Sequence, residues 1–279
     1  MNGRFLRILA LVASGLAMLA PPAGAGSAAA LNLVTTTTAL LPAAAHSVGS
    51  FGTSWRTDLW ISNPNSSSVA ATIRFFPANT DNGGVPAASP LAQEVVPALG
   101  TVFLPDVLGA AGLPDDVKGA LRVDVAGDQS HPVVVGSRTY NRFTTGPGTY
   151  GQYVPAMQDS STPVSELFLT GLRGDAGYRT NVGIVSASPE AIGGIVVHVL
   201  NENGVEVGSY ELGLYAYGMT QIDNIVSKLS PSPGSLPVFS IRIDFVDWRG
   251  DHVAQPVTAY ASVIDNTSGD GVFVPARTP

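Results

Sequence analysis

Hydrophobic and polar residues alternate over many short stretches of the chain, which is the pattern of half-buried β-strands. The clearest example is LRVDV at residues 121–125, and residues 58–62 alternate in the same way. We expect the apolar positions of the first stretch, Leu121, Val123 and Val125, to face a core, together with Ile241, Ile243 and Phe245 of the similar stretch at 241–245. The polar positions between them, Arg122, Asp124, Arg242 and Asp244, should face outward and not be buried. Helical periodicity is nearly confined to residues 104–113 and 221–229. The pattern predicts an all-β protein.

The succession of predicted strands occurs twice along the chain. WRTDLWI at residues 55–61 is similar to YRTNVGI at 178–184, and LRVDV at 121–125 is similar to IRIDF at 241–245. Further matches in the same order are residues 72–76 with 195–199, with the register open by one residue, 100–108 with 218–226, and GQYVPA at 151–156 with GVFVPA at 271–276. Equivalent segments lie about 120 residues apart, which indicates two tandem domains rather than a solenoid of short repeats.

Composition narrows the fold class of each unit. Charged residues make up 13% of the chain, and there are 31 Gly and 21 Pro, which favours many short strands joined by turns. About seven strands in roughly 110 residues is typical of an immunoglobulin-like β-sandwich. The chain has no cysteine, so the inter-sheet disulfide of antibody domains is absent and alternating Leu, Ile and Val must supply the core.

The N-terminal residues have the features of a secretory signal peptide. Arg4 and Arg7 precede an apolar run at residues 8–19, and small residues follow at 21–30. We expect residues 1–30 to be the signal peptide and a small-residue linker, residues 31–156 the first sandwich and residues 157–279 the second. The mature chain should lie outside the cytoplasm, secreted to the extracellular space or the periplasm, and should have no membrane span. Pro42 suggests that residues 38–42 form an edge strand.

The motif RTDLWISNPNSSSVAATIRFF at residues 56–76 is a strand that ends in Asn-Pro before a second strand. It resembles the immunoglobulin-like repeat modules of secreted bacterial proteins of unknown role, and the resemblance covers residues 41–276. It implies a β-sandwich fold and an extracytoplasmic location, and it implies no catalytic residue.

Several classes of function are disfavoured by the residues present. The net charge of −7 argues against nucleic acid, whose binding depends on basic patches. There is no cysteine and no G-x-S-x-G motif, so a nucleophile with an adjacent base is not apparent. Residues 79–83 resemble the start of a calcium loop, but Pro90 stands where the loop needs an acid. We therefore predict no catalytic residue, no metal and no cofactor.

Binding residues are sought where the two units differ and where polar or aromatic side chains face solvent. Trp60 falls on the polar side of its strand, and the equivalent position in the second unit is Gly183. The long loop at residues 77–90 replaces a tight turn at 201–204, and loops on a rigid sandwich often carry recognition. The candidate binding residues are Trp60, Asp81, Asn82, Arg122, Arg138 and Tyr140.

The sequence therefore predicts a secreted, non-enzymatic binding or structural module of the bacterial cell exterior, with a protein or a glycan as its ligand. The alternative is a carbohydrate-binding accessory protein, or a hydrolase, with a site near Trp60 and the loop at 77–90. An exposed tryptophan is compatible with both, because its ring can stack on a sugar or anchor a protein partner.

Overall fold

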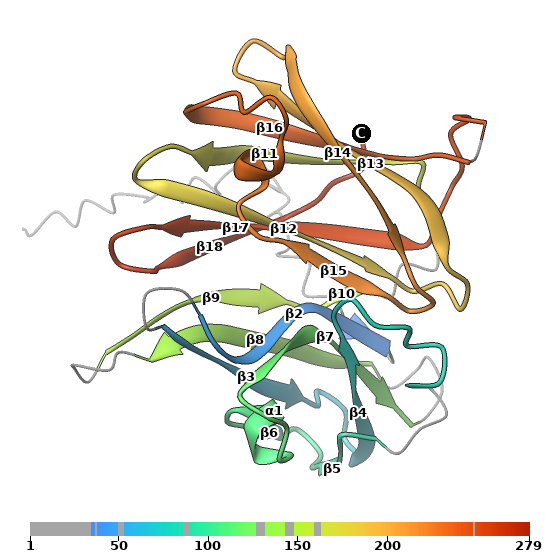
Figure 1. The fold of residues 1–279 in the computed structure, drawn as a ribbon. Coiled ribbons are helices and arrows are strands. Elements are labelled where there is room, and N and C mark those ends of the chain that lie inside the picture. The colour runs from blue at the N-terminus through green and yellow to red at the C-terminus, as the bar shows by residue number, and fades with distance from the viewer. Residues whose placement is uncertain are drawn as a thin grey trace, which may run out of the picture. The chain divides into compact units, whose positions relative to one another are not determined.

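Antiparallel β-strands dominate the computed structural model, which describes residues 35–36, 38–49, 53–85, 90–126, 132–142, 148–158, 163–247 and 249–279. The all-β expectation is confirmed (Figure 1). Residues 34–279 belong to one compact unit, and only this unit is described. The predicted signal peptide, residues 1–30, lies outside the described residues. No helix among the described residues has the length and apolar character needed to cross a membrane.

Residues 35–158, the first half, contribute ten strands to one sheet system. They are β1 (Thr35–Thr36), β2 (Thr38–Val48), β3 (Ser54–Ser62), β4 (Val69–Pro77), β5 (Ala92–Val96), β6 (Thr101–Leu104), β7 (Asp116–Val125), β8 (Val133–Arg142), β9 (Thr149–Pro155) and β10 (Met157–Gln158). The order β5-β4-β7-β2 forms one layer, and β6-β3-β8-β9 forms the other. The layers are joined where Ser47 and Val48 of β2 pair with Trp55 and Ser54 of β3.

Residues 166–275, the second half, form two four-stranded sheets. Their strands are β11 (Glu166–Gly174), β12 (Tyr178–Ser186), β13 (Ile192–Asn201), β14 (Glu206–Leu214), β15 (Met219–Ile222), β16 (Leu236–Phe245), β17 (Val257–Asp265) and β18 (Gly271–Pro275). The sheet orders are β11-β16-β13-β14 and β15-β12-β17-β18. Read from the other edge, the first order matches β5-β4-β7-β2 of the first half strand for strand, and the second matches β6-β3-β8-β9.

Helical turns and strand register follow the same correspondence. The helix α1 (Val107–Ala110) and the 3-10 turn η3 (Ile225–Lys228) occupy equivalent places, and each follows a residue with left-handed backbone, Asp106 or Asn224. Arg74 pairs with Arg122 across β4 and β7, as His198 pairs with Arg242 across β13 and β16. Residues 72–76 therefore correspond to 196–200, one residue later than the sequence match.

Each half has its own apolar core between its two layers. The predicted inward faces are confirmed: Leu121, Val123, Ile241, Ile243 and Phe245 are all fully buried, and Val125 is nearly so. The prediction was wrong for Asp244, which was expected on an exposed outer face but is only 5% exposed. Its carboxylate is enclosed because it accepts from Arg242 Nε at 3.0 Å and lies 3.2 Å from His198 Nε2.

The central position of Val123 makes a direct test of the first-half core. Val123→Ala should lower the free energy of unfolding by about 2 kcal/mol, because it removes two methyl groups from a close-packed site. The matched control is Val95→Ala in β5, where the side chain is 67% exposed and the cost should stay under about 0.5 kcal/mol. Urea denaturation measures both; equal costs would show that the inward face of β7 is misassigned.

Pro42 does not mark an edge strand, contrary to the expectation for residues 38–42. Strand β2 pairs along its length with β7, and on its other side with β10 and β3. The β2–β7 register shifts between Leu41 and Ala44, so Pro42 sits in a β-bulge. Proline has no backbone N–H to donate to a neighbouring strand, and a bulge, like an edge, is a position where that hydrogen bond is not needed.

A third apolar cluster joins the two halves. The first half contributes Leu40, Ala43, Phe76, Ala120 and Val154, and the second half contributes Val185, Met219 and Tyr260. Because one face of β17 packs on its own core and the other packs on the first half, all residues from Val257 to Ile264 are buried. We call this contact the joint; it covers the outer side of β15-β12-β17-β18.

Candidate binding face

The outer side of β6-β3-β8-β9, which we call the outer face, gathers aromatic and charged side chains. Alternation along β3 fixes which residues take part, because Leu59 and Ile61 are fully buried in the core and their neighbours point away from it. The side chains of the outer face are Asp58, Trp60, Phe103, Arg138, Tyr140 and Tyr153.

Three aromatic rings form a strip across the strands of the outer face. Trp60 and Tyr153 stack with their ring centroids 5.8 Å apart and an interplanar angle of 24°. Phe103 is the cross-strand partner of Trp60. Tyr153 is 50% exposed and Phe103 56% exposed, while Trp60 is half-buried between strands. The strip thus offers apolar ring surface to solvent.

Gly136 makes room for the stacked pair. A Cβ at this position would lie 2.8 Å from Trp60 Nε1 and 2.9 Å from the Tyr153 hydroxyl oxygen, closer than side-chain atoms approach. The two rings therefore lie over the β8 backbone at Gly136, which is the cross-strand neighbour of Trp60.

Polar groups lie directly beside the aromatic strip. The Arg138 guanidinium carbon is 5.2 Å from the centroid of the Tyr140 ring, and Arg138 donates to Thr149 Oγ1 at 3.0 Å. The Tyr140 hydroxyl donates to Asp58 Oδ1 at 3.3 Å. Burial, together with the charge and the hydrogen bond of Asp58, raises the pKa of Tyr140, so the hydroxyl stays a neutral donor at physiological pH.

A charged network closes one end of the outer face. His46 is nearly buried, and its two ring nitrogens each lie 2.8 Å from a carboxylate oxygen, of Asp106 and of Asp115. Arg56 contacts the same two carboxylates, at 3.3 Å and 2.7 Å. Asp58 also accepts from the backbone amide of Asp106 at 2.9 Å. These groups hold one another and anchor β3 to the turn that leads into α1.

The structure brings together three of the six predicted binding residues, Trp60, Arg138 and Tyr140. Arg122 does not join them, because β7 belongs to the other layer and its outer side lies across the first-half core. There Arg122 Nε donates to Asp124 at 2.8 Å, and Arg74 contacts the same carboxylate at 3.0 Å.

Asp81 and Asn82 lie away from Trp60, in a loop that docks on the second half. Asn82 was predicted as a binding residue of an exposed loop, yet it is only 1% exposed. Its side-chain nitrogen donates to the carbonyls of Pro77 and Tyr217, each at 3.0 Å, and its backbone amide donates to Ala216. Asp81 is exposed and caps the amide of Gly83 at 3.0 Å. These hydrogen bonds hold the loop against the second half, a contact that we call the clasp of the joint. They bury the Asn82 side chain, so it is not accessible to a ligand.

Asn82→Ala should lower the free energy of unfolding by about 2 kcal/mol, because two buried carbonyls lose their donor. The matched control is Asn203→Ala, in an exposed turn of the second half, where a change within about 0.5 kcal/mol is expected. Urea denaturation compares the two variants, and an Asn82→Ala cost as small as that of the control would contradict the clasp.

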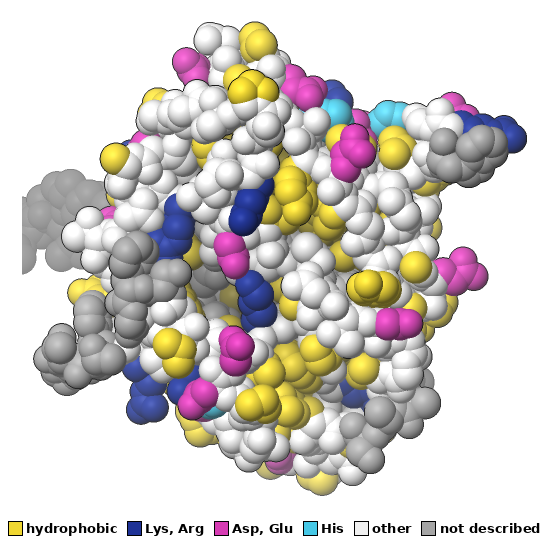
Figure 2. All heavy atoms as spheres, in the orientation of Figure 1, with side chains coloured by type: hydrophobic (Ala, Val, Ile, Leu, Met, Phe, Trp, Pro, Cys, Tyr) yellow, Lys and Arg dark blue, Asp and Glu magenta, His cyan; other side chains and the backbone are white. Residues whose placement is uncertain are grey.

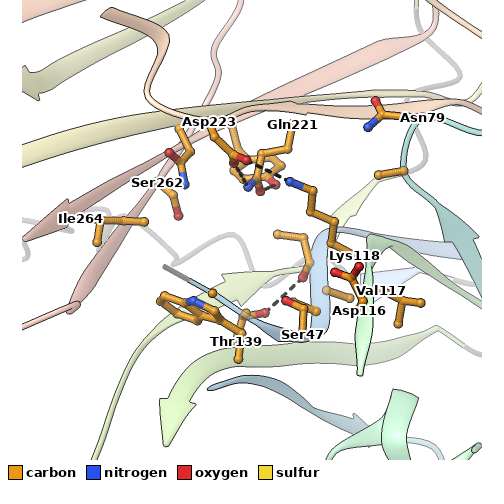
Figure 3. A pocket seen from close by; sticks show the side chains of 18 of the residues that line it. Ser47, Asn79, Asp116, Val117, Lys118, Thr139, Gln221, Asp223, Ser262 and Ile264 are labelled. Carbon is orange, nitrogen blue, oxygen red and sulfur yellow. Dashed lines mark hydrogen bonds and ion pairs between the residues drawn. The ribbon is translucent and has the colours of Figure 1, made fainter. Parts of the chain in front are cut away.

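A cavity of about 790 Å³ opens between the halves beside the joint (Figure 3). Lys118 of β7 crosses it to donate to Asp223 at 3.1 Å, and Gln221 donates to the same carboxylate at 2.6 Å. Burial lowers the pKa of the Arg179 guanidinium at its rim, against the opposing charge of Asp223. The contact between Lys118 and Asp223 joins the two halves across the cavity.

The second-half equivalent of the outer face is the surface covered by the joint. Trp60 corresponds to Gly183, and Gly136 to Tyr260. Tyr260 stacks on Phe273 with centroids 5.3 Å apart, as Trp60 stacks on Tyr153. The large and small residues have exchanged strands, but an aromatic pair occupies the same place. Tyr260 is 1% exposed, whereas the first-half pair leaves Tyr153 50% exposed to solvent.

Sequence reasoning missed Tyr153 and Phe103. The match of GQYVPA to GVFVPA carried a signal for Tyr153, since it aligns Tyr153 with Phe273 and keeps an aromatic residue in both units. No such signal exists for Phe103, whose equivalent is Gln221.

Comparison with known proteins gives no functional assignment. No family model matches the chain, and no curated protein matches it. Among solved structures, a lectin from Pleurotus ostreatus in complex with GalNAc is 13% identical, with 87% of this chain and 86% of that chain covered and a TM-score of 0.22. The apo form of a Pleurotus ostreatus lectin is 11% identical, with 88% and 82% covered and a TM-score of 0.21. Likeness at these TM-scores carries no conclusion about this chain.

Proposed function

We propose that the protein is a secreted, non-enzymatic module of the bacterial cell exterior that binds a partner through the outer face. Export is inferred from the charged and apolar pattern of residues 1–30. The absence of a nucleophile motif in the sequence favours binding over catalysis. On the face shown in Figure 2, basic and acidic side chains are interspersed without a continuous basic patch, which supports a partner other than nucleic acid.

We further propose that the two halves are immunoglobulin-like sandwiches that arose by tandem duplication. The support is the strand-for-strand match of both sheet orders and the equivalent helical turns α1 and η3. The β-bulge recurs as well, because the register shift after Leu41 has its counterpart after Leu169. Independent origins would not reproduce these irregular features at equivalent positions.

The observation that carries the binding proposal is the contrast between the two equivalent faces. In the second half Tyr260 is buried and Phe273 is partly buried at the joint, whereas in the first half Tyr153 is half exposed and its stack with Trp60 is left open. Exposed aromatic strips with a few polar neighbours are typical of recognition surfaces, where aromatic and Arg side chains contribute most of the binding energy.

Trp60→Ala and Tyr153→Ala should each weaken binding to the partner by about 1–3 kcal/mol, because each removes half of the stacked pair. The partner is recovered by pull-down from cell envelope, and affinity is measured by calorimetry. The matched control is Tyr215→Ala, an equally exposed aromatic of the second half, which should bind as the wild type. Unchanged binding by both outer-face variants would place the site elsewhere.

A glycan is the second candidate partner, favoured by one observation. Asp58, Arg138 and Tyr140 line up beside the aromatic strip and are joined by the contacts described above, so ring stacking and hydrogen bonding are available side by side. A glycan array decides: glycan signals that Tyr153→Ala abolishes support this candidate. A panel of hydrolase substrates should show no turnover, and turnover would contradict a non-enzymatic role.

A further inference from the structure

We infer that the outer face binds a second copy of this chain, which docks through the outer side of β11-β16-β13-β14 in its second half. This inference rests on the proposed function of the outer face and adds the identity of the partner. The docking surface consists of Phe168, Leu200, Val238 and Ser240 on that sheet, with Val272 of β18 beside it, and we call it the docking face.

The joint within the chain provides the template. There the outer side of β5-β4-β7-β2 in the first half, with β9 beside it, covers the outer side of β15-β12-β17-β18 in the second half. Leu40, Phe76 and Ala120 supply the apolar contacts. Polar contacts flank them: Lys118 donates to Asp223 at 3.1 Å, and Ser262 donates to Gln152 at 2.6 Å.

Because the halves correspond strand for strand, each half has one surface of the covering kind and one of the covered kind. The joint uses the covering surface of the first half and the covered surface of the second, so one surface of each kind stays free. The first half keeps its outer face, the equivalent of the surface that is covered in the second half. The second half keeps its docking face, the equivalent of the surface that does the covering. A second copy can therefore repeat the same sheet-on-sheet contact between molecules, with no surface used twice.

The docking face keeps the size pattern of the surface that forms the joint. Register places Phe168 at the position of Leu40, since each pairs with the outward Arg of its sheet, Arg242 or Arg122. The same correspondence places Leu200 at Phe76 and Ser240 at Ala120. Large residues thus remain large and small ones small.

Two exposed valines replace the polar residues that bridge the joint. Val238 stands at the position of Lys118, three residues before Ile241 as Lys118 stands before Leu121. Val272 stands at the position of Gln152, one residue before the aromatic of the stacked pair. They are 53% and 62% exposed. In the joint, Lys118 and Gln152 contact Asp223 and Ser262, whose first-half equivalents are Pro105 and Arg138. The outer face also offers the exposed rings of Tyr153 and Phe103, so apolar surface on each molecule would be withdrawn from water.

The contact between copies lacks the clasp of the joint. The loop that buries Asn82 has only the tight turn at residues 201–204 as its second-half counterpart. Association should therefore be weaker than the joint and depend on concentration. It is also heterologous, because different surfaces of the two copies meet, so it extends head to tail into longer assemblies instead of stopping at a symmetric dimer.

Sedimentation velocity of the full chain over a concentration series tests this directly. The wild type should show a weight-average sedimentation coefficient that rises with concentration. Tyr153→Glu on the outer face and Val238→Glu on the docking face should each abolish the rise. Both residues are at least half exposed, so both variants should melt cooperatively within about 4 °C of the wild type, which excludes loss of fold as the cause.

Mixing the two variants separates head-to-tail contact from every other mode. Each variant retains one intact surface, so an equimolar mixture should form a dimer and no larger species. A symmetric dimer through the outer face would leave Val238→Glu able to associate with itself, both alone and in the mixture, and that result would overturn the inference. So would a wild type that stays monomeric at its highest soluble concentration. If Tyr153→Ala nevertheless weakens binding to an envelope protein or a glycan, the proposed function stands and only the second copy is excluded.

Discussion

Replacing Tyr260 by alanine should lower the free energy of unfolding by about 3–5 kcal/mol, the usual cost of truncating a buried aromatic. Tyr260 is 1% exposed, stacks on Phe273 and packs among the apolar residues of the joint. Burial raises the pKa of its hydroxyl well above the usual range, so the group remains a neutral donor to Gln221 at 3.0 Å. Chemical denaturation followed by fluorescence gives the change.

Two controls separate the ring from the hydroxyl and from the stacking. Tyr260→Phe should cost only about 1 kcal/mol, since it removes a single hydrogen bond. Tyr153→Ala removes one ring of the first-half aromatic pair. That ring is half exposed, so its loss should cost about 1 kcal/mol or less. If Tyr260→Ala were no more costly than Tyr153→Ala, the joint would contribute little to stability.

Gly183→Ala should lower the free energy of unfolding by about 3 kcal/mol, because the added methyl group overpacks a closed site. A Cβ at this position would lie 2.0 Å from Cε1 of the Tyr260 ring, and that ring is enclosed by the joint on its other side. Neither the strand nor the ring can move without opening the contact between the halves. A thermal melt reports the loss, and a melting temperature within a degree of the wild type would contradict the packing.

The matched control for Gly183→Ala is Gly193→Ala, because nothing lies within 4 Å of a Cβ at Gly193. That change should be neutral, or stabilising by about 0.4–1 kcal/mol through the unfolded state. Coupling provides a second check: in the Tyr260→Ala background the cost of Gly183→Ala should nearly vanish, since the ring that it strikes is gone.

Short-range alternation was enough to predict which way most strands face. Leu121, Val123 and Ile243 are buried as expected because a period of two leaves one choice of face once one side is apolar. Asp244 was misassigned because its burial depends on His198, which reaches it from a neighbouring strand. Pro42 was misassigned because a bulge and an edge have the same local requirement, and only the pairing with β7 distinguishes them.

The candidate site was predictable only in part, for a similar reason. Trp60, Arg138 and Tyr140 share the outer face because their strands are neighbours in one layer. Arg122 was grouped with them on its alternation alone, which does not reveal the layer to which a strand belongs. Asn82 has the composition of an exposed loop residue, and its burial arises from the carbonyl of Tyr217, 135 positions away in the chain. Contacts at that separation leave no local pattern.

The exchange of large and small residues between the halves restricts how coding segments for them can recombine. A sandwich assembled from β12 and β8 would set Gly183 against Gly136, leaving Tyr153 without a ring to stack on. The reverse hybrid, β3 with β17, would set Trp60 against Tyr260 in a space where each needs a glycine beneath it. Only crossovers that carry both strands from one parent yield a packed product. Making the two halves alike at only one of these strands would therefore break the packing of an aromatic pair, so the open and the covered face each depend on two strands at once.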